Sequence, residues 1–350
     1  MSTFPSYKRI LISRMKFIGD VVLTTPVIRS VRNAFPDAYI AYMAEAQAAS
    51  LLEQNPCLNE IIPFDFARPT WREQPRVAAL LRRRRFDLAI DLFGNPRSAL
   101  LMYLSGARTR VGLDRPGRGL FYTVRVRDEA GFKTAINFHM QFLRAIGIPQ
   151  TSARTEIFLT DNERALARHQ LAGAVQGAGP VVGLHPGATW PAKRWLPERF
   201  ADVAQKVRER LGAQVIFTAG PDDHDLMQSV RRSLQAEIPV FTGLPLRQLA
   251  ALLSQCSAYV ANDSGPMHMA VAVGTPTIGI FGPGEENIWF PYLQAEGNIP
   301  LRHDVSCHPC HLDFCNRGEG EFMQCMTGLS GESVLTAIEQ SLRSRSRPPV

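Results

Sequence analysis

The chain has 350 residues, of which 45% are hydrophobic and 20% are charged, a composition typical of a globular protein large enough for two domains. Its 26 Gly and 25 Pro are not concentrated in any run, which excludes collagen-like and low-complexity classes. No run of about 18 apolar residues occurs, and residues Met1 to Lys8 are polar. We therefore expect no membrane span and no secretory signal, with the cytoplasm as the compartment.

The formal net charge is +7, and the 39 basic residues include only five Lys, which leaves 34 Arg. Arg suits anionic partners because its planar fork of donors matches phosphates and carboxylates. A GC-rich genome or solvated helix faces would explain the same excess. The arginines that gather in the N-terminal half are the run Arg82 to Arg85 and the group Arg108, Arg110, Arg115 and Arg118.

Short apolar runs alternate with segments of helical periodicity through the first half of the chain. The pattern predicts strands at Arg9–Ser13, Tyr39–Met43, Glu60–Phe64, Leu88–Leu92 and Thr109–Leu113, and helices at Val22–Ala34, Ala46–Gln54, Pro75–Arg85 and Ala135–Ile146. Such βαβ alternation indicates a parallel sheet with helices on both faces.

The same alternation restarts after a glycine-containing stretch near residues 173–180. It predicts strands at Val181–His185, Gln214–Ala219, Pro239–Thr242, Ala258–Ala261 and Thr277–Phe281, and helices at Pro197–Leu211, Leu226–Gln235, Leu246–Ser254 and Gly265–Val273. We therefore expect two open α/β domains, at 1–165 and 175–350. Ligand sites in such domains lie at the carboxyl ends of the strands.

A carboxylate follows the first predicted strand. Gly19 and Asp20 stand where a helix should begin, and the turn lacks both the G-x-G-x-x-G and the G-x-x-x-x-G-K-[ST] pattern. Asp20 could simply cap that helix. The functional alternative is a general base that accepts a proton from a substrate hydroxyl.

A second loop directly follows the first strand of the second domain. It runs from His185 through Gly187, Ala188 and Thr189 to Lys193, Arg194 and Trp195. Adjacent cations just before a helix suit a phosphate clamp, whereas an exposed basic loop anchored by tryptophans is the structural alternative.

A third loop lies between a strand and the helix beginning near residue 265. Its residues are Asp263, Ser264, Gly265, Pro266, Met267 and His268. The free N–H groups of a first helical turn and the positive end of the helix dipole form an anion site. Asp263 or Ser264 could also cap this helix, and His268 could be a buried core residue.

Asp222 and Asp223 precede His224 and Asp225, which gives an Asp-x-Asp spacing that holds a divalent ion in some sugar-nucleotide enzymes. Acidic residues opening a helix are the commoner explanation, and we favour it.

Taken together, the first three loops resemble glycosyltransferase family 9, the lipopolysaccharide heptosyltransferases. The resemblance rests on Gly19-Asp20-Val21, on the loop from His185 to Trp195, and on Asp263 to His268 followed by Gly274-Thr275-Pro276 and Phe281-Gly282-Pro283. These motifs span nearly the whole chain in the family's order. Pro191-Ala192 before Lys193 departs from the acidic or polar residues that some members have there.

The resemblance implies a GT-B fold, in which two Rossmann-like domains with parallel sheets face each other across a cleft. It implies inverting transfer of heptose from ADP-heptose to the lipopolysaccharide inner core without a catalytic metal. Asp20 would be the base, Lys193 would contact the diphosphate and Asp263 would hold the sugar. The remaining nucleotide-sugar contacts would come from His185, Gly187, Ala188, Thr189, Ser264, Gly265, Pro266, Met267 and His268.

The implied partners are ADP-heptose, a lipid A inner-core acceptor and the anionic inner-membrane surface, at which the enzyme would be peripheral; no nucleic acid is expected. Two alternatives within the class are an autotransporter-type protein heptosyltransferase and a transferase of another nucleotide sugar. An alternative of another class is a nonenzymatic two-lobed nucleotide-binding protein, which would need no Asp20.

Four of the six cysteines crowd into one segment, at Cys307, Cys310, Cys315 and Cys325. In a reducing compartment, four thiols at these spacings suit a structural Zn²⁺ or iron site. Unpaired thiols and redox disulfides are the alternatives, since the x₄ and x₉ gaps fall outside the common zinc-finger spacings.

Overall fold

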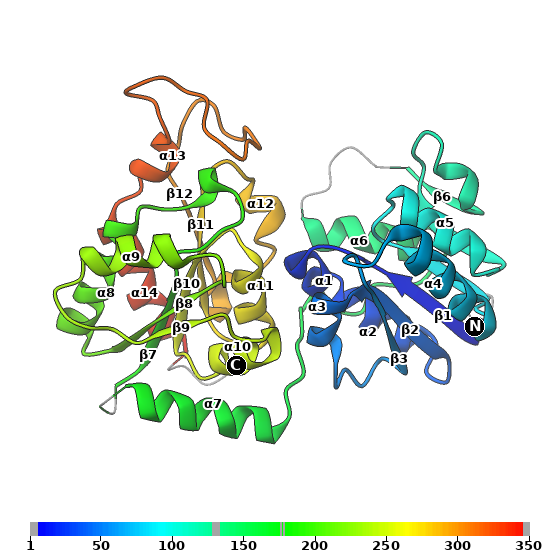
Figure 1. Cartoon of the computed structure of the whole chain (residues 1–350), viewed down its shortest axis with the longest axis horizontal. Helices are drawn as coiled ribbons and strands as arrows, with labels where there is room; N and C mark the ends of the chain where they lie inside the picture. The colour runs from blue at the N-terminus through cyan, green and yellow to red at the C-terminus, as the bar shows by residue number, and fades with distance from the viewer. Residues whose placement is uncertain (1–5, 128–133, 176, 178, 346–350) are drawn as a thin grey trace. The chain divides into compact units, whose positions relative to one another are not determined.

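The computed structural model describes residues 6–127, 134–175, 177 and 179–345. Its contacts divide the chain into two compact units, Met1–Phe158 and Leu159–Val350. The first five residues of the polar N-terminal stretch lie outside the described residues. Figure 1 shows that the strands of each unit run side by side among the helices.

Unit 1 is built on a six-stranded parallel sheet with the order β3-β2-β1-β4-β5-β6. Its elements are β1 (Arg9–Ser13), α1 (Ile18–Leu23), α2 (Thr25–Ala34), β2 (Tyr39–Glu45), α3 (Ala46–Ala49), η1 (Ser50–Leu52), β3 (Glu60–Phe64), α4 (Thr70–Arg84), β4 (Leu88–Asp91), α5 (Pro96–Leu104), β5 (Thr109–Leu113), η2 (Gly119–Phe121), β6 (Val124–Val126) and α6 (Ala135–Arg144). The central strands β1 and β4 are almost wholly buried, as expected of a sheet covered on both faces.

Unit 2 repeats this architecture with the strand order β12-β11-β10-β7-β8-β9, again parallel. Its elements are α7 (Asp161–Ala174), β7 (Val181–His185), η3 (Pro191–Lys193), α8 (Pro197–Leu211), β8 (Gln214–Ala219), α9 (His224–Arg232), β9 (Val240–Thr242), α10 (Leu246–Leu253), β10 (Ala258–Asn262), α11 (Gly265–Ala272), β11 (Thr277–Phe281), α12 (Glu286–Trp289), η4 (Gln294–Glu296), β12 (Ile299–Arg302), α13 (Gln324–Thr327) and α14 (Gly331–Arg345). The prediction of two parallel α/β units is confirmed.

One expected helix is divided in two. The predicted helix at Val22–Ala34 is instead α1 and α2, which meet at Thr24. The Thr24 hydroxyl donates to the Val21 carbonyl at 2.7 Å and lies 2.5 Å from the Tyr42 hydroxyl. Pro26 stands in the first turn of α2, where its missing N–H costs nothing.

The boundary between the units falls at Phe158, before the expected end of the first domain at 165. The reason is α7, which packs with unit 2. Thr160 caps this helix by accepting from the Glu163 amide at 3.2 Å, and Arg247 donates to the Glu163 carboxylate at 2.6 Å. Hydrogen bonding to Arg247 lowers the pKa of Glu163 to about 2.

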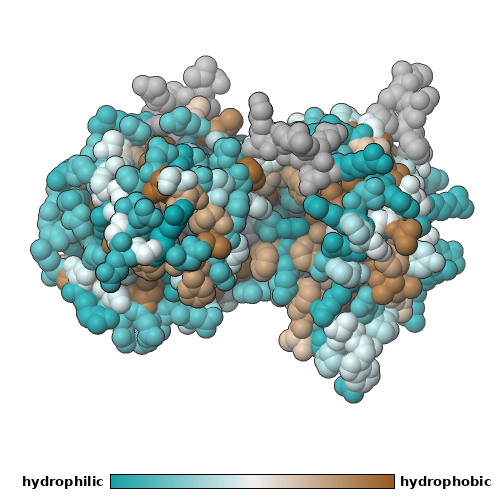
Figure 2. Space-filling model, turned by 90° about the horizontal axis from the view of Figure 1, so that it is seen from above, coloured by the Kyte–Doolittle hydropathy of each residue, from teal (hydrophilic) through white to brown (hydrophobic). Residues whose placement is uncertain are grey.

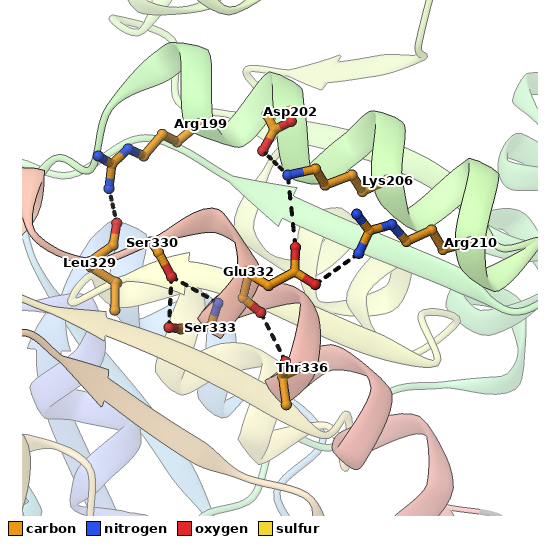
Figure 3. A network of polar contacts seen from close by, with 9 residues as sticks. All are labelled: Arg199, Asp202, Lys206, Arg210, Leu329, Ser330, Glu332, Ser333 and Thr336. Carbon is orange, nitrogen blue, oxygen red and sulfur yellow. Dashed lines mark hydrogen bonds and ion pairs between the residues drawn. The ribbon is translucent and has the colours of Figure 1, made fainter.

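The C-terminal helix α14 is fastened to α8 by the polar network in Figure 3. The Glu332 carboxylate accepts from Arg210 at 2.8 Å and lies 3.9 Å from Lys206, which also pairs with Asp202 at 2.8 Å. Just before this helix, the Leu329 carbonyl accepts from the buried indole N–H of Trp195 at 3.2 Å. These contacts fix the chain where it leaves the cysteine-rich segment.

Candidate functional site

Asp20 lies in the first turn of α1, three positions after the N-cap Phe17 rather than at the cap itself. Its Oδ2 accepts from the Phe17 amide at 3.2 Å, and its Oδ1 lies 2.7 Å from Nη2 of Arg14. Only 13% of the side chain is exposed. Both oxygens are therefore oriented, and each keeps lone-pair capacity for a further donor.

Arg14 is the cation that orients this carboxylate. Its Nη1 donates to the Leu92 carbonyl at 3.2 Å, and its guanidinium lies 5.0 Å from the centre of the Phe93 ring. The neighbouring Lys16 instead lies 3.8 Å from Glu45. Unit 1 thus holds one preorganised carboxylate at the carboxyl end of β1.

Asp91, which the sequence analysis missed, shapes the loop that Arg14 touches. Its buried carboxylate accepts from the amides of Phe93 and Gly94 at 3.0 Å each and from the Tyr122 hydroxyl at 2.7 Å. Burial raises the pKa of Asp91. A lone Asp within the otherwise apolar run Leu88–Leu92 was the signal available in the sequence.

In unit 2, His185 ends β7, and its side chain is buried. Its Nδ1 lies 3.0 Å from the Thr218 hydroxyl, which lies 2.6 Å from the Tyr259 hydroxyl. Burial lowers the pKa of His185 to about 4, against an opposing effect of Asp223. His185 is therefore neutral near pH 7, and its contact with Thr218 helps to hold the start of the loop after β7.

Gly187 has no room for a side chain, because an added Cβ would lie 2.3 Å from Oδ2 of Asp223. That carboxylate accepts from the Gly220 amide at 2.8 Å. Asp223 thus holds a turn next to the loop, which favours the structural explanation of the Asp-x-Asp spacing. Arg194 donates through Nε to the Ala188 carbonyl at 2.8 Å, so its guanidinium braces the same loop. Thr189, the next residue, is exposed.

Lys193 and Asp263 form an ion pair that joins the second and third predicted loops. Nζ of Lys193 lies 2.6 Å from Oδ2 of Asp263, and the two side chains are 20% and 7% exposed. Among the described residues no other group hydrogen-bonds to this oxygen. Nζ also lies 4.6 Å from the centre of the Trp190 ring. A Cβ on Gly284 would stand 2.9 Å from the same carboxylate oxygen.

The helix α11 begins next to this pair, with Ser264 as its N-cap and Pro266 in its first turn. The Ser264 hydroxyl oxygen is buried and has no hydrogen-bond partner among the described residues. Met267 and His268 are buried, and Nδ1 of His268 lies 2.7 Å from the Tyr292 hydroxyl.

Asn262, whose role the sequence did not reveal, connects the loop after β10 to the loop after β7. Its Oδ1 accepts from the Trp195 amide at 3.1 Å, and its Nδ2 donates to the Pro186 carbonyl at 2.8 Å. The side chain is fully buried at the end of β10. Lys193, Asp263 and the first turn of α11 therefore belong to one fixed arrangement that presents a cation and helix amides together, as an anion site requires.

The cysteine-rich segment lies against the same loops. All four of its cysteines are free thiols of intermediate exposure. Burial raises the pKa of Cys325 to about 11, and the neighbouring thiols of Cys310, Cys307 and Cys315 add to this effect. No three His, Cys, Asp or Glu side chains among the described residues are already arranged to hold a metal ion.

Much of the chain matches a known protein family. The family model "Glycosyltransferase family 9 (heptosyltransferase)" matches residues 75–317. Lipopolysaccharide heptosyltransferase 2 of Escherichia coli K12 is 27% identical over 299 residues, which cover 81% of this chain and 85% of that protein.

Two solved structures resemble the whole chain. A glycosyl transferase family 9 protein from Veillonella parvula aligns with a TM-score of 0.85 at 27% identity, covering 98% of this chain and 99% of the other. The E. coli ADP-heptose lps heptosyltransferase II aligns with a TM-score of 0.80 at 24% identity, covering 97% and 100%. The family match spans more than half of the residues, and this chain therefore belongs to glycosyltransferase family 9, the heptosyltransferases of lipopolysaccharide core synthesis.

Proposed function

We propose that this enzyme transfers heptose from ADP-heptose to the lipopolysaccharide inner core with inversion at the anomeric carbon and without a catalytic metal. The observation that carries the proposal is the Lys193–Asp263 pair at the start of α11. This arrangement offers a diphosphate a cation and helix amides while keeping a carboxylate beside it for sugar hydroxyls. The similar E. coli protein is an ADP-heptose enzyme.

In the donor site, Lys193 and the first-turn amides of α11 would stabilise the charge that builds on the leaving ADP. Asp263 would accept hydrogen bonds from the sugar. Gly187, Ala188 and Thr189 would pass close to the nucleotide, because the loop at Gly187 is held without a side chain. His185 would act indirectly, by keeping this loop in place.

In unit 1, Asp20 would take the proton from the acceptor hydroxyl as that oxygen attacks the anomeric carbon. Arg14 and the Phe17 amide hold the carboxylate in one orientation, so little reorganisation is needed when the proton moves. The C–O bond to ADP breaks as the new glycosidic bond forms on the opposite face of the sugar. Positive charge for the leaving group would come from Lys193 and the helix dipole, which is why we propose no divalent ion.

The acceptor would be a lipid A inner core at the cytoplasmic side of the inner membrane. Near the end of α4, Arg82, Arg83 and Arg85 are exposed and line an open cavity of about 620 Å³. Two other arginines of unit 1, Arg110 and Arg118, instead donate to backbone carbonyls and so stabilise the fold.

A peripheral, electrostatic contact with the membrane would suit a protein whose surface carries exposed arginines. None of the described helices combines the length and apolarity needed to cross a bilayer. On the face in Figure 2, hydrophilic residues dominate and apolar ones form small separate groups. Anionic lipids attract basic residues by about 1 kcal/mol each near the surface.

The test is to incubate purified enzyme with ADP-heptose and a panel of lipopolysaccharides truncated at defined core positions. We expect one heptose to be added, by product mass, and the opposite anomeric configuration, by NMR of the product. Added Mg²⁺ or Mn²⁺ should not raise the rate. Modification of a protein acceptor, or turnover only with another nucleotide sugar, would favour the corresponding alternative. ADP binding with no transfer to any acceptor would favour a nonenzymatic binding protein.

A further inference from the structure

Four cysteines from one short segment surround a single cavity. Cys307, Cys310, Cys315 and Cys325 all line a cavity of about 560 Å³, to which Ala192 and Pro283 also contribute. The other two cysteines of the chain, Cys57 and Cys256, are buried elsewhere. The Met323 amide donates to Sγ of Cys315 at 3.3 Å, a contact that also suits a thiolate bound to a metal.

The segment that carries them has little apolar packing of its own. Between β12 and α13 it forms turns but no helix or strand. Its two phenylalanines, Phe314 and Phe322, are 65% and 53% exposed. Its ends are fixed by β12 and by the contacts of α14 in Figure 3. A crosslink would order the residues in between, as bound metal does in small folds with too little core.

We propose that the four thiols bind one Zn²⁺ or iron ion in a tetrahedral structural site. Four S–metal bonds replace four S–H bonds, the protons pass to solvent, and no electron is transferred. Because the side chains are not yet arranged as a cage, the sulfurs move inward from the cavity wall on binding. Four protein ligands leave no open position, so the site is structural.

The two histidines between Cys307 and Cys315, His308 and His311, are not ligands in this assignment. Nε2 of His308 lies 2.9 Å from the Gly284 carbonyl, and Nε2 of His311 lies 3.4 Å from the Glu285 carboxylate. Both rings contact the loop after β11, and we therefore assign the metal to the four thiols alone.

This site also supports the donor-binding loops, a consequence that rests on the proposed function. The Ala192 amide donates to the Asp313 carbonyl at 3.0 Å, and the His311 amide donates to the Pro283 carbonyl at 3.1 Å. His308 bonds to Gly284, which lies against Asp263. The segment therefore holds Ala192, which precedes Lys193, and Gly284, which lies against Asp263. Metal removal should free both positions and so weaken ADP binding. If the loops keep their places in about a tenth of the molecules, ADP affinity falls about tenfold.

The experiment uses untagged full-length protein purified without chelator. Elemental analysis should find about one zinc or iron per chain, and a mercurial thiol reagent should release it. No metal in protein with four freely titrating thiols, or an intact mass showing disulfides, would overturn the proposal. Cys310→Ser should lose the metal, while Cys57→Ser, the matched control in unit 1, should retain it. If Cys310→Ser does not fold, metal release from the native protein still decides.

Calorimetry then measures ADP affinity before and after metal removal, with circular dichroism as the check on folding. A fall of about tenfold is expected. Unchanged affinity in folded, metal-free protein would overturn the link to the donor loops. Native protein that contains the metal but does not bind ADP would contradict the proposed function and leave the metal site standing.

Discussion

Replacing Lys193 with Met would test the donor site, because this change removes the charged Nζ, which lies 4.6 Å from the centre of the Trp190 ring, and keeps an unbranched apolar side chain. A charge-assisted hydrogen bond contributes about 1.5 to 3 kcal/mol. We therefore expect ADP affinity to fall by about tenfold to 150-fold. Lys206→Met is the matched control, since Lys206 pairs with Asp202 on α8 and should leave ADP affinity unchanged.

The same substitution leaves the Asp263 carboxylate, 7% exposed, without its cation. Breaking a buried pair costs about 3 to 5 kcal/mol, but Lys193 is 20% exposed, so solvent reduces the cost and we expect about 1 to 3 kcal/mol. Urea unfolding at pH 7 measures this loss. A Lys193→Met/Asp263→Asn double variant removes the unpaired charge and should recover most of the stability.

The double variant also separates two causes of weaker binding. If Lys193 contacts the diphosphate, ADP affinity stays low when the stability returns. If ADP affinity recovers fully, the loss came from repulsion by an unpaired Asp263. Calorimetry on folded protein that shows unchanged ADP affinity in Lys193→Met would refute the assignment of Lys193.

Three further changes test separate parts of the structure. Asp20→Asn keeps the shape but cannot take a proton, so turnover should fall by about 10²-fold or more with ADP-heptose affinity nearly intact; equal turnover in this variant and in the exposed control Asp37→Asn would reject the base. Burial lowers the pKa of His185 to about 4, below its unfolded value of about 6.5, so stability should be lost as the pH falls from about 6.5 to about 4. Urea midpoints across that range measure this loss, and a pH dependence that survives in His185→Gln would assign it to other groups. Tyr122→Phe removes the hydroxyl that donates to buried Asp91 and should cost about 1 to 3 kcal/mol; an unchanged urea midpoint would show that Asp91 finds another donor.

The sequence predicts the strands well where they are apolar and end at small or polar residues. The strands β1, β7 and β11 begin and end as predicted, because continuous apolar runs are typical of buried parallel strands. The edge strand β12 was missed, since Pro300 argues against a strand except at an edge, where its missing N–H is harmless.

The candidate site was only partly predictable. The loops holding Lys193 and Asp263 follow β7 and β10, and the rule that ligands lie at strand carboxyl ends indicates both. Their 2.6 Å contact joins residues far apart in the chain and depends on the strand order, which no local pattern contains. Asp91 and Asn262 were missed for a related reason. The sequence pattern of a polar residue at the end of an apolar strand is the same whether its side chain faces solvent or hydrogen-bonds to the backbone of a buried loop.

The Asn262 amide has a consequence for how a ligand would be received. It accepts from one end of the loop after β7 and donates to the other end, a combination that an aspartate at this position could not supply, because an ionised Asp has no donor. This loop is therefore held at both ends when the chain folds, and the entropy of ordering it is lost before any nucleotide arrives. A preordered site lets more of each new contact appear as affinity. Asn262→Asp should return that ordering cost to the binding step, and calorimetry would register it as a less favourable binding entropy for ADP.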